Sequence, residues 1–329
     1  MKKEFNECIL CPRNCSVNRN NGKLGYCRVG NELVIAKYYL HKWEEPCITG
    51  KNGSGTIFFS HCNLRCIFCQ NYKISILNYG KKITIDEFSK ICLELQDRGA
   101  TNINLVTPTH FVPLIIDGIK LAKKIGLRIP IVYNSSGYEN IETIKMLDGI
   151  VDIYLPDFKY YSDEYAVKYS KCSNYFKYAS STINEMVAQR GKCRFDREGN
   201  MLSGVLVRHL LLPEMEEDSK KILKYLYDTY GNNIYVSIMN QYTPVRKCKY
   251  TELNSKVSNK VYNEIIDYAW DIGIRNAFIQ EEGTQSESFI PNFNIEKFTE
   301  WKKNFIFWSS FNHLVFQKQL MLILILAVG

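Results

Sequence analysis

Residues 55–69 read GTIFFSHCNLRCIFC, an apolar run followed at once by three cysteines. The run has the β-branched and aromatic composition of a buried strand, and the cysteines follow where a loop begins. A loop can wrap several thiolates around one compact object, whereas a strand points alternate side chains to opposite sides. Three residues separate Cys62 from Cys66, and two separate Cys66 from Cys69. This stretch predicts a metal centre with three thiolate ligands.

Other interpretations of the three cysteines can be weighed from the same letters. Spacings of four and seven also place residues on one face of a helix, but Asn63 and Arg65 interrupt any apolar stripe. Zinc takes four protein ligands, or three and a water, and a conventional iron–sulfur cubane takes four cysteines. Three thiolates on a four-iron cluster leave one iron open. S-adenosylmethionine (SAM) can chelate that iron, and one-electron cleavage of its sulfonium gives a 5′-deoxyadenosyl radical.

Apolar runs alternate with helical segments beyond the first strand. The runs lie at 55–60, 103–107, 129–134, 149–157, 204–212, 234–239 and 276–280, and the helical segments at 84–98, 112–125, 139–147, 162–190, 216–230 and 257–272. We also expect a strand at 33–40 and a hairpin turn at 198–200. Repeated βα units require parallel strands with right-handed crossovers, which form a full or partial barrel with its active site at the carboxyl ends of the strands. A doubly wound open sheet is the alternative, although no G-x-G-x-x-G follows a strand.

Composition places the chain in an ordinary class. It has 329 residues, of which 46% are hydrophobic and 23% charged, as in a soluble globular protein. The net charge of +8 is scattered without a basic stripe, so nucleic-acid binding is not favoured. The N-terminus has no apolar run of the kind found in signal peptides. We therefore expect a cytoplasmic, reducing location, where the 12 cysteines favour metal binding over disulfides.

A second group of cysteines lies in the first 50 residues, which have little apolar surface to bury. The group supplies enough ligands for one zinc site or one auxiliary iron–sulfur cluster, and its members are Cys8, Cys11, Cys15 and Cys27. Cys47 is a substitute ligand, a catalytic thiol or a buried cysteine. We expect the remaining cysteines to be buried free thiols, namely Cys92, Cys172, Cys193 and Cys248.

The spacing of the three cysteines, with Phe68 before the last, resembles the signature of the radical SAM superfamily. Further segments resemble its branch related to pyruvate formate-lyase activating enzymes: NINLVTPTHFVP (102–113), VYNSSGY (132–138), DIYLPDFKY (152–160), LVRHLLLPE (206–214), VSIMNQYTP (236–244) and SESFIPNF (286–293). The resemblance covers about residues 5–293. It implies an α/β fold, an incomplete (β/α)6 barrel over residues 51–293. A small Cys-rich metal-binding segment at 1–50 precedes it, and an atypical apolar tail at 294–329 follows.

The resemblance also implies site residues. Cys62, Cys66 and Cys69 would hold a [4Fe-4S] cluster that binds SAM and would be catalytic. The implied cofactor-binding residues are Phe68, Thr109, His110, Asn134, Ser136, Asp157, Lys159 and Arg208. Activating enzymes carry a GGE-type motif where this chain has Pro108-Thr109-His110, so Thr107, Thr109 and His110 are only candidates for polar contacts.

Several of these residues have a plain structural alternative. His110 is alternatively a satisfied loop histidine, and Lys159 a solvated lysine at a strand end. Arg208 interrupts the apolar run VLVRHLLL, where burial is costly unless the charge is paired, so it faces the barrel interior or a carboxylate. Gln241 and Tyr242 end the sixth strand and line the cavity or serve packing.

The function implied by the resemblance is reductive cleavage of SAM followed by hydrogen abstraction from a substrate. A glycyl-radical enzyme is the first candidate substrate, and another protein, an RNA or a small molecule is the alternative. A non-catalytic iron–sulfur electron-transfer or sensing protein is the alternative from another class. We expect a flavodoxin- or ferredoxin-type reductant and a monomeric chain. Residues 304–329 are nearly uncharged. They are interpreted as a core-packing helix, as an artefact of the translated sequence or as a peripheral membrane anchor.

Overall fold

The computed structural model describes residues 1–280, 285, 291 and 293. Residues Met1–Pro291 form one compact unit. The tail at 294–329 and most of the segment at 286–293 lie outside the described residues, so the interpretations of both stay predictions. Within the described part of the chain, no helix combines the length and apolar character needed to cross a membrane.

One mixed sheet runs through this unit, in the strand order β10-β9-β8-β6-β5-β4-β2-β1-β3. The strands that lie from β2 to β10 in this order are all parallel to their neighbours. They are β2 (Ser54–Phe59), β4 (Ile103–Val106), β5 (Ile131–Ser135), β6 (Ile153–Pro156), β8 (Met201–Leu210), β9 (Tyr235–Met239) and β10 (Ala277–Ile279). β1 (Leu33–His41) runs antiparallel to β2, and β3 (Lys81–Ile83) runs antiparallel to β1. The expected hairpin is present, since β7 (Arg194–Phe195) pairs with the start of β8.

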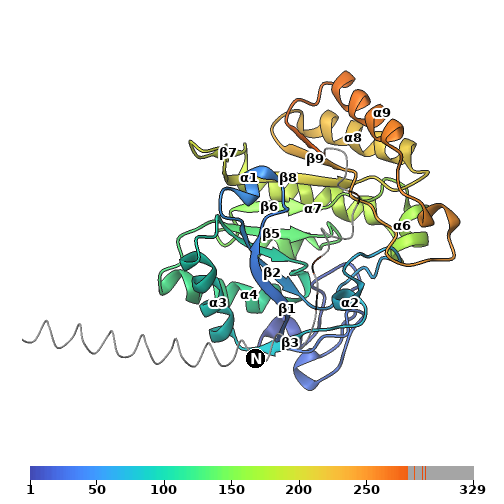
Figure 1. Cartoon of the computed structure of the whole chain (residues 1–329). Helices are drawn as coiled ribbons and strands as arrows, with labels where there is room; N and C mark the ends of the chain where they lie inside the picture. Colours follow the sequence, from blue (N-terminus) through green and yellow to red (C-terminus); the bar gives the residue numbers. More distant parts are fainter. Residues whose placement is uncertain (281–284, 286–290, 292, 294–329) are drawn as a thin grey trace, which may run out of the picture. The chain divides into compact units, whose positions relative to one another are not determined.

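Helices follow the parallel strands as the βα pattern predicts (Figure 1). They are α3 (Ile85–Asp97), α4 (Val112–Lys124), α5 (Ile141–Lys145), α6 (Asp163–Ser170), α7 (Tyr175–Arg190), α8 (Glu216–Tyr230) and α9 (Asn259–Asp271). A capping box begins α3, in which the Glu87 backbone N–H donates to Thr84 Oγ1 at 3.1 Å and the Thr84 backbone N–H donates to the Glu87 carboxylate at 2.8 Å.

One helix prediction was wrong. The segment at 162–190 forms two helices, because Lys171 and Asn174 take left-handed backbone conformations, with φ of 51° and 55°. The Asp163 carboxylate accepts hydrogen bonds from the backbone N–H groups of Asn174 and Tyr175, both at 3.0 Å, and so holds the start of α7 beside the start of α6. The periodicity of the apolar residues continues across this break, so the sequence did not reveal it.

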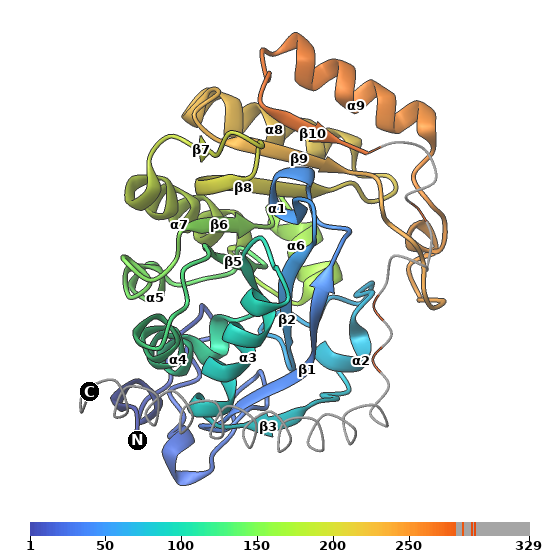
Figure 2. The same ribbon diagram turned by 60° about the vertical axis from the view of Figure 1, so that its left-hand side comes forward.

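The sheet forms an incomplete barrel, as predicted. Its end strands, β10 and β3, are not neighbours in the strand order. Residues at the carboxyl ends of strands spread across the whole sheet nevertheless line one cavity, for example Phe58 of β2, Asn134 of β5 and Met239 of β9. The sheet therefore curves around that cavity. Figure 2 shows β1 and β2 on one side of the short helix α1 (Pro46–Thr49) and β8 and β9 on the other.

Helix α1 fills the inner face of the curved sheet. Its Cys47 and Ile48 are buried against Val132 of β5, Leu155 of β6 and Leu206 of β8. Cys47 therefore packs as a buried apolar residue. β1 belongs to the same sheet as the barrel strands, so the division at residue 50 remains a sequence-based prediction.

The remaining cysteines divide into two groups. All 12 are free thiols. Cys92 and Cys172 are buried as expected, but Cys193 and Cys248 are only half-buried. Cys193 lies next to β7, in the β7–β8 hairpin. Cys248 lies just before a 3-10 turn at Thr251–Asn254.

Candidate active site

The three clustered cysteines lie in residues 61–71, between β2 and the short helix α2 (Tyr72–Ser75), a segment called the cysteine loop from here on. His61 and Arg65 take left-handed backbone conformations, with φ of 71° and 64°, which turn the chain tightly around the thiols. Cys62, Cys66 and Cys69 all line one cavity of about 240 Å³ at the carboxyl ends of the barrel strands. The structure thus brings together the thiols that the sequence singled out.

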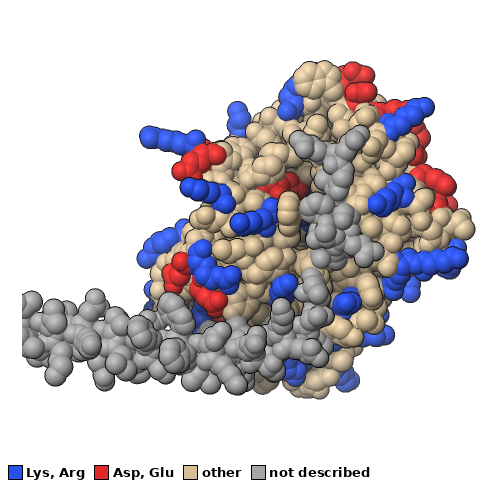
Figure 3. Space-filling view, in the orientation of Figure 1, with Lys and Arg blue, Asp and Glu red and all other residues tan. Residues whose placement is uncertain are grey.

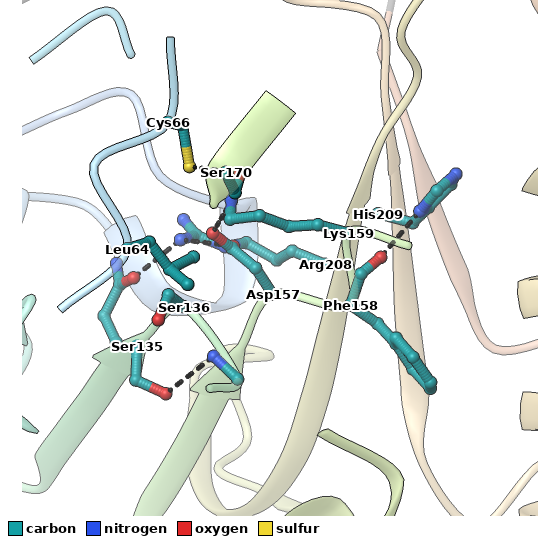
Figure 4. A network of polar contacts seen from close by, with 12 residues as sticks. Leu64, Cys66, Ser135, Ser136, Asp157, Phe158, Lys159, Ser170, Arg208 and His209 are labelled. Atoms are coloured by element: carbon teal, nitrogen blue, oxygen red, sulfur yellow. Dashed lines mark hydrogen bonds and ion pairs between the residues drawn. The ribbon is translucent and has the colours of Figure 1, made fainter. Parts of the chain in front are cut away.

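Each thiol of the cysteine loop has a hydrogen-bond partner that suits a thiolate. The Leu64 backbone N–H donates to Cys62 Sγ at 3.3 Å, and Ser170 Oγ donates to Cys66 Sγ at 2.9 Å (Figure 4). Cys69 Sγ is hydrogen-bonded to Ser75 Oγ at 3.2 Å. Donors of this kind stabilise sulfur that carries negative charge, as it does when it binds a metal.

Burial sets the protonation of Cys66 and Cys69 when they have no metal. It raises the pKa of Cys66 well above its usual range, although the positive charge of Lys159 acts in the opposite direction. Burial likewise raises the pKa of Cys69, and its hydrogen bond with Ser75 lowers it. A bound metal reverses this preference, since a coordinated thiol is deprotonated. Among the described residues, no three His, Cys, Asp or Glu side chains are already placed to hold a metal ion.

A network of charged side chains faces the thiols from the ends of β6 and β8 (Figure 4). The Asp157 carboxylate accepts from Lys159 Nζ at 2.6 Å and is paired with Arg208 at 2.9 Å. Arg208 also donates to Asn134 Oδ1 at 2.6 Å and pairs with Glu44 Oε2 at 3.3 Å. The arginine that interrupts the apolar β8 strand is therefore paired inside the barrel.

The network keeps its cations charged. Burial alone would raise the pKa of Asp157, but Lys159 and Arg208 hold it below its usual value. Burial alone would lower the pKa of Lys159, but Asp157 and the Cys66 thiol raise it. Both cations line the same cavity as the three cysteines. They can therefore bind a carboxylate held next to the thiols.

A glycine allows the loops of this network to come close together. The backbone of Gly137 follows β5 with φ of 74°, and a Cβ atom built there would lie 2.3 Å from the carbonyl oxygen of Asp157. Asn134 and Ser136, on the same turn, line the cavity, and Ser136 Oγ donates to Asn63 Oδ1 at 3.4 Å. Gly137 thus lets polar groups from β5 approach both Asp157 and the cysteine loop.

Two predicted cofactor contacts, Thr109 and His110, do not lie at the cavity. Thr109 Oγ1 donates to Glu139 Oε1 at 2.6 Å, and His110 Nε2 donates to the carbonyl oxygen of Ser60 at 2.8 Å. A 3-10 turn at Thr109–Phe111 buries both side chains beneath the strand ends. Thr107, with a φ of 60°, lines the cavity instead. His110 therefore makes one hydrogen bond in this turn, and its buried Nδ1 has no partner among the described residues; burial lowers its pKa to about 3 and keeps it neutral.

The aromatic residue of the cysteine loop forms one wall of the cavity. The Phe68 ring lies edge-on to Tyr242, with 6.0 Å between the ring centroids. Gln70 Nε2 donates to the carbonyl oxygen of Gln241 at 2.9 Å, which ties the cysteine loop to the end of β9. Gln241 and Tyr242 both line the cavity.

Sequence reasoning missed a group of cavity residues that come before the first barrel strand. His41, Trp43 and Glu44 line the cavity: β1 ends at His41, which pairs with Ser54 at the start of β2, and the chain that follows contacts Arg208 of β8 through Glu44. The paired acids at 44–45, followed by proline, were the available signal.

The N-terminal cysteines are also gathered together. Burial raises the pKa of Cys27, and the neighbouring Cys8 and Cys15 thiols raise it further; burial and the nearby Cys27 and Cys8 act in the same way on Cys11. The Tyr26 backbone N–H donates to Cys15 Sγ at 3.2 Å. These thiols and their donor would suit a bound metal.

Arg13 joins the N-terminal cysteines to the cysteine loop. It lies between Cys11 and Cys15 and donates to the carbonyl oxygens of Asn63 at 2.8 Å and Leu64 at 3.3 Å. It also donates to the carbonyl oxygens of Ser170 and Lys171, at the end of α6. One guanidinium thus braces the backbone of the cysteine loop from the N-terminal segment.

Comparison with known proteins agrees with this geometry. The family model described as the radical SAM superfamily matches residues 56–226, which include the cysteine loop and the strands from β4 to β8. The chain belongs to the radical SAM superfamily. Membership implies SAM and a [4Fe-4S] cluster as cofactors. In this radical SAM protein, the three thiols of the cysteine loop, each with a hydrogen-bond partner, are the residues that would hold the cluster.

Two curated relatives are similar to this radical SAM protein. The uncharacterized protein MJ0674 of Methanocaldococcus jannaschii is 30% identical over 279 residues, which are 82% of this chain and 75% of that one. The pyruvate formate-lyase-activating enzyme of Clostridium pasteurianum is 27% identical over 199 residues, 56% of this chain and 73% of the enzyme.

Solved structures include more distant matches. SuiB of Streptococcus suis bound to S-adenosylmethionine matches 68% of this chain with 11% identity and a TM-score of 0.47, and this chain covers 49% of SuiB. The structure of tagged anSMEcpe with bound AdoMet matches 64% of this chain with 14% identity and a TM-score of 0.46, and 57% of that chain is covered. This radical SAM protein therefore spans about half the length of those chains.

Proposed function

We propose that the chain is a radical SAM oxidoreductase that cleaves SAM reductively and abstracts hydrogen from its substrate. The observation that carries this proposal is the single cavity lined by three thiols and by the cations Lys159 and Arg208. Cys62, Cys66 and Cys69 would hold a [4Fe-4S] cluster, which when bound would supply the electron for reductive cleavage of SAM.

The protein's own residues position the cofactor. Lys159 binds the SAM carboxylate, because it remains charged beside Cys66. Asp157 orients Lys159 and Arg208, while Asn134 and Ser136 offer polar contacts at the end of β5. Phe68 and Tyr242 close the cavity on the side of β9, where they exclude water from a reactive radical.

A glycyl-radical enzyme is the substrate we favour. Similarity to the pyruvate formate-lyase-activating enzyme of Clostridium pasteurianum supports it, and so does a barrel that stays open between its end strands. Another protein, an RNA or a small molecule is the second candidate, because Pro108-Thr109-His110 departs from the GGE-type motif. A flavodoxin- or ferredoxin-type protein is the proposed reductant.

Production of 5′-deoxyadenosine tests the proposed function. The full-length chain is reconstituted anaerobically, reduced with dithionite and incubated with SAM. We expect product from the wild type and from Cys92→Ala, which removes a buried thiol of α3, and none from Cys66→Ala. A wild type that binds the cluster but forms no product would favour the non-catalytic electron carrier or sensor.

We also propose a second metal centre at the four N-terminal thiols. It is a zinc ion or an auxiliary iron–sulfur cluster, held by Cys8, Cys11, Cys15 and Cys27. Metal and sulfide analysis of a Cys62/Cys66/Cys69 triple-Ala variant separates the two. Zinc near one atom per chain indicates a structural site, remaining iron and sulfide indicate a cluster, and neither metal refutes the second centre.

A further inference from the structure

A second cavity adjoins the first inside the barrel. It has a volume of about 190 Å³ and lies between the segment at 42–46 and the strands β8, β9 and β10. The two cavities share part of their lining, namely Trp43, Glu44, Arg208, Met239 and Gln241. A molecule held beside the cysteine loop can therefore extend one of its groups into the second cavity.

Glu45 lines the second cavity and has an unpartnered, buried carboxyl oxygen. The residue is 9% exposed, and among the described residues no donor is hydrogen-bonded to its buried Oε2. Glu45 is the N-cap residue of α1, yet its side chain makes no capping hydrogen bond. An unpartnered buried polar atom costs free energy that a bound donor recovers.

The neighbouring cations form their ion pairs with other carboxylates, although the charge of Arg208 also acts on Glu45. Arg208 pairs with Glu44 at 3.3 Å and with Asp157 at 2.9 Å, and Lys159 pairs with Asp157 at 2.6 Å. The other Glu44 oxygen accepts from Asn104 Nδ2 at 3.1 Å. Three carboxyl groups thus share two buried cations, and Glu45 is the carboxyl group without an ion pair of its own among the described residues. Figure 3 shows acidic atoms recessed near the centre of the face that it views.

The rim of the cavity adds an aromatic ring and one exposed cation. Trp43 lies at the junction of the two cavities, lines both and is 64% exposed. Aromatic faces attract ammonium and guanidinium groups. Lys42 also lines this cavity but is exposed to solvent, where its charge is screened. The buried end of the cavity therefore favours a cationic group.

We propose that the second cavity is a substrate subsite, in which Glu45 binds the ammonium or guanidinium group of a lysine or arginine side chain from a polypeptide substrate. The assignment to substrate rests on the proposed function. The second cavity is smaller than the first, at about 190 Å³ against about 240 Å³, so it suits one side chain of a molecule that also reaches the first cavity. The remainder of the polypeptide lies toward the first cavity, where the radical is formed.

Binding of a small cation tests the subsite directly. The probes are n-butylammonium and 1-butanol, which have the same number of heavy atoms but differ in charge. Ligand-observed NMR on the cluster-loaded full-length chain gives their dissociation constants. We expect n-butylammonium to bind at least about tenfold more tightly than 1-butanol, since a hydrogen bond to a charged group is strong in a buried site.

Variants and a peptide locate the interaction. Glu45→Gln should remove most of the preference for n-butylammonium, whereas Glu217→Gln, which changes an exposed acid of α8, should keep it. Equal binding of the two probes by the wild type would overturn the proposal without any variant. So would a Glu45→Gln chain that loads its cluster and retains the preference. The peptide N-acetyl-Gly-Lys-Gly-amide should bind more tightly than n-butylammonium. If the peptide does not bind, the subsite takes a small amine only, and the polypeptide assignment is overturned.

The two proposals fail separately. A wild type that forms 5′-deoxyadenosine but does not prefer n-butylammonium would refute the subsite alone. A wild type that prefers n-butylammonium through Glu45 but never cleaves SAM would refute the proposed function, and the cavity would then be a cation site without a radical substrate.

Discussion

Replacing Asp157 with asparagine probes the charge network that faces the cysteine loop. The carboxylate contacts Lys159 at 2.6 Å and Arg208 at 2.9 Å, and the three side chains are only 14–16% exposed. Removing one partner of a buried ion pair costs about 3–5 kcal/mol, because the remaining charge stays buried. Arg208 keeps Asn134 and Glu44 as partners, which favours the lower end of that range.

Urea unfolding of the full-length chain under anaerobic conditions measures this cost. We expect Asp157→Asn to lower the free energy of unfolding by about 3 kcal/mol. The matched control is Asp228→Asn, which breaks an ion pair with Lys224 at 2.9 Å whose side chains are 54% and 61% exposed. The control should lose less than about 1 kcal/mol. Equal, small losses in the two variants would refute the argument that the network is buried and tightly paired.

Three more variants address the surroundings of the site. Burial raises the pKa of Glu139 from 4.5 to about 8. Between these pH values the folded chain keeps a proton on Glu139 that the unfolded chain releases. The free energy of unfolding should therefore fall as the pH rises from about 4.5 to about 8, by at most about 1.4 kcal/mol per pH unit. Urea titrations at several pH values measure this slope, and Glu139→Gln should abolish it. Gly137→Ala should reduce SAM binding in equilibrium dialysis far more than Gly149→Ala, because both have φ near 70° but a Cβ meets nearby atoms only at Gly137; equal effects would show that the close approach is unimportant. Arg13→Ala should lower the iron bound per chain, whereas the exposed Lys23→Ala should not, and unchanged iron in Arg13→Ala would rule out its bracing role.

The fold was largely predictable because its strands are short and apolar and its helices have clear ends. The run at 55–60 became β2, and the capping box at Thr84 began α3 within one residue of expectation. Two features resisted prediction for physical reasons. The break before Tyr175 depends on side-chain caps supplied by Asp163 across the turn, and the antiparallel pairing of β1 and β3 depends on long-range contacts that no local pattern records.

The site was predictable where spacing along the chain determines the chemistry. The three thiols of the cysteine loop were found this way, and the ends of β6 and β8 supplied Asp157, Lys159 and Arg208 as the resemblance implied. The contribution of Glu44 and Glu45 was missed, because it follows from the pairing of β1 with β2 rather than from any motif. Thr109 and His110 were placed at the cavity by analogy with the family. The 3-10 turn that contains them instead buries their side chains away from the cavity lining.

The most direct test of the central claim is the electron paramagnetic resonance spectrum of the reduced cluster with and without SAM. If three thiolates leave one iron open, SAM binds that iron and changes the spectrum of the wild type, and this change disappears in a chain whose cluster cannot form, Cys62/Cys66/Cys69 triple Ala. A cluster signal that SAM leaves unchanged in the wild type would contradict the claim that the cysteine loop holds an open iron.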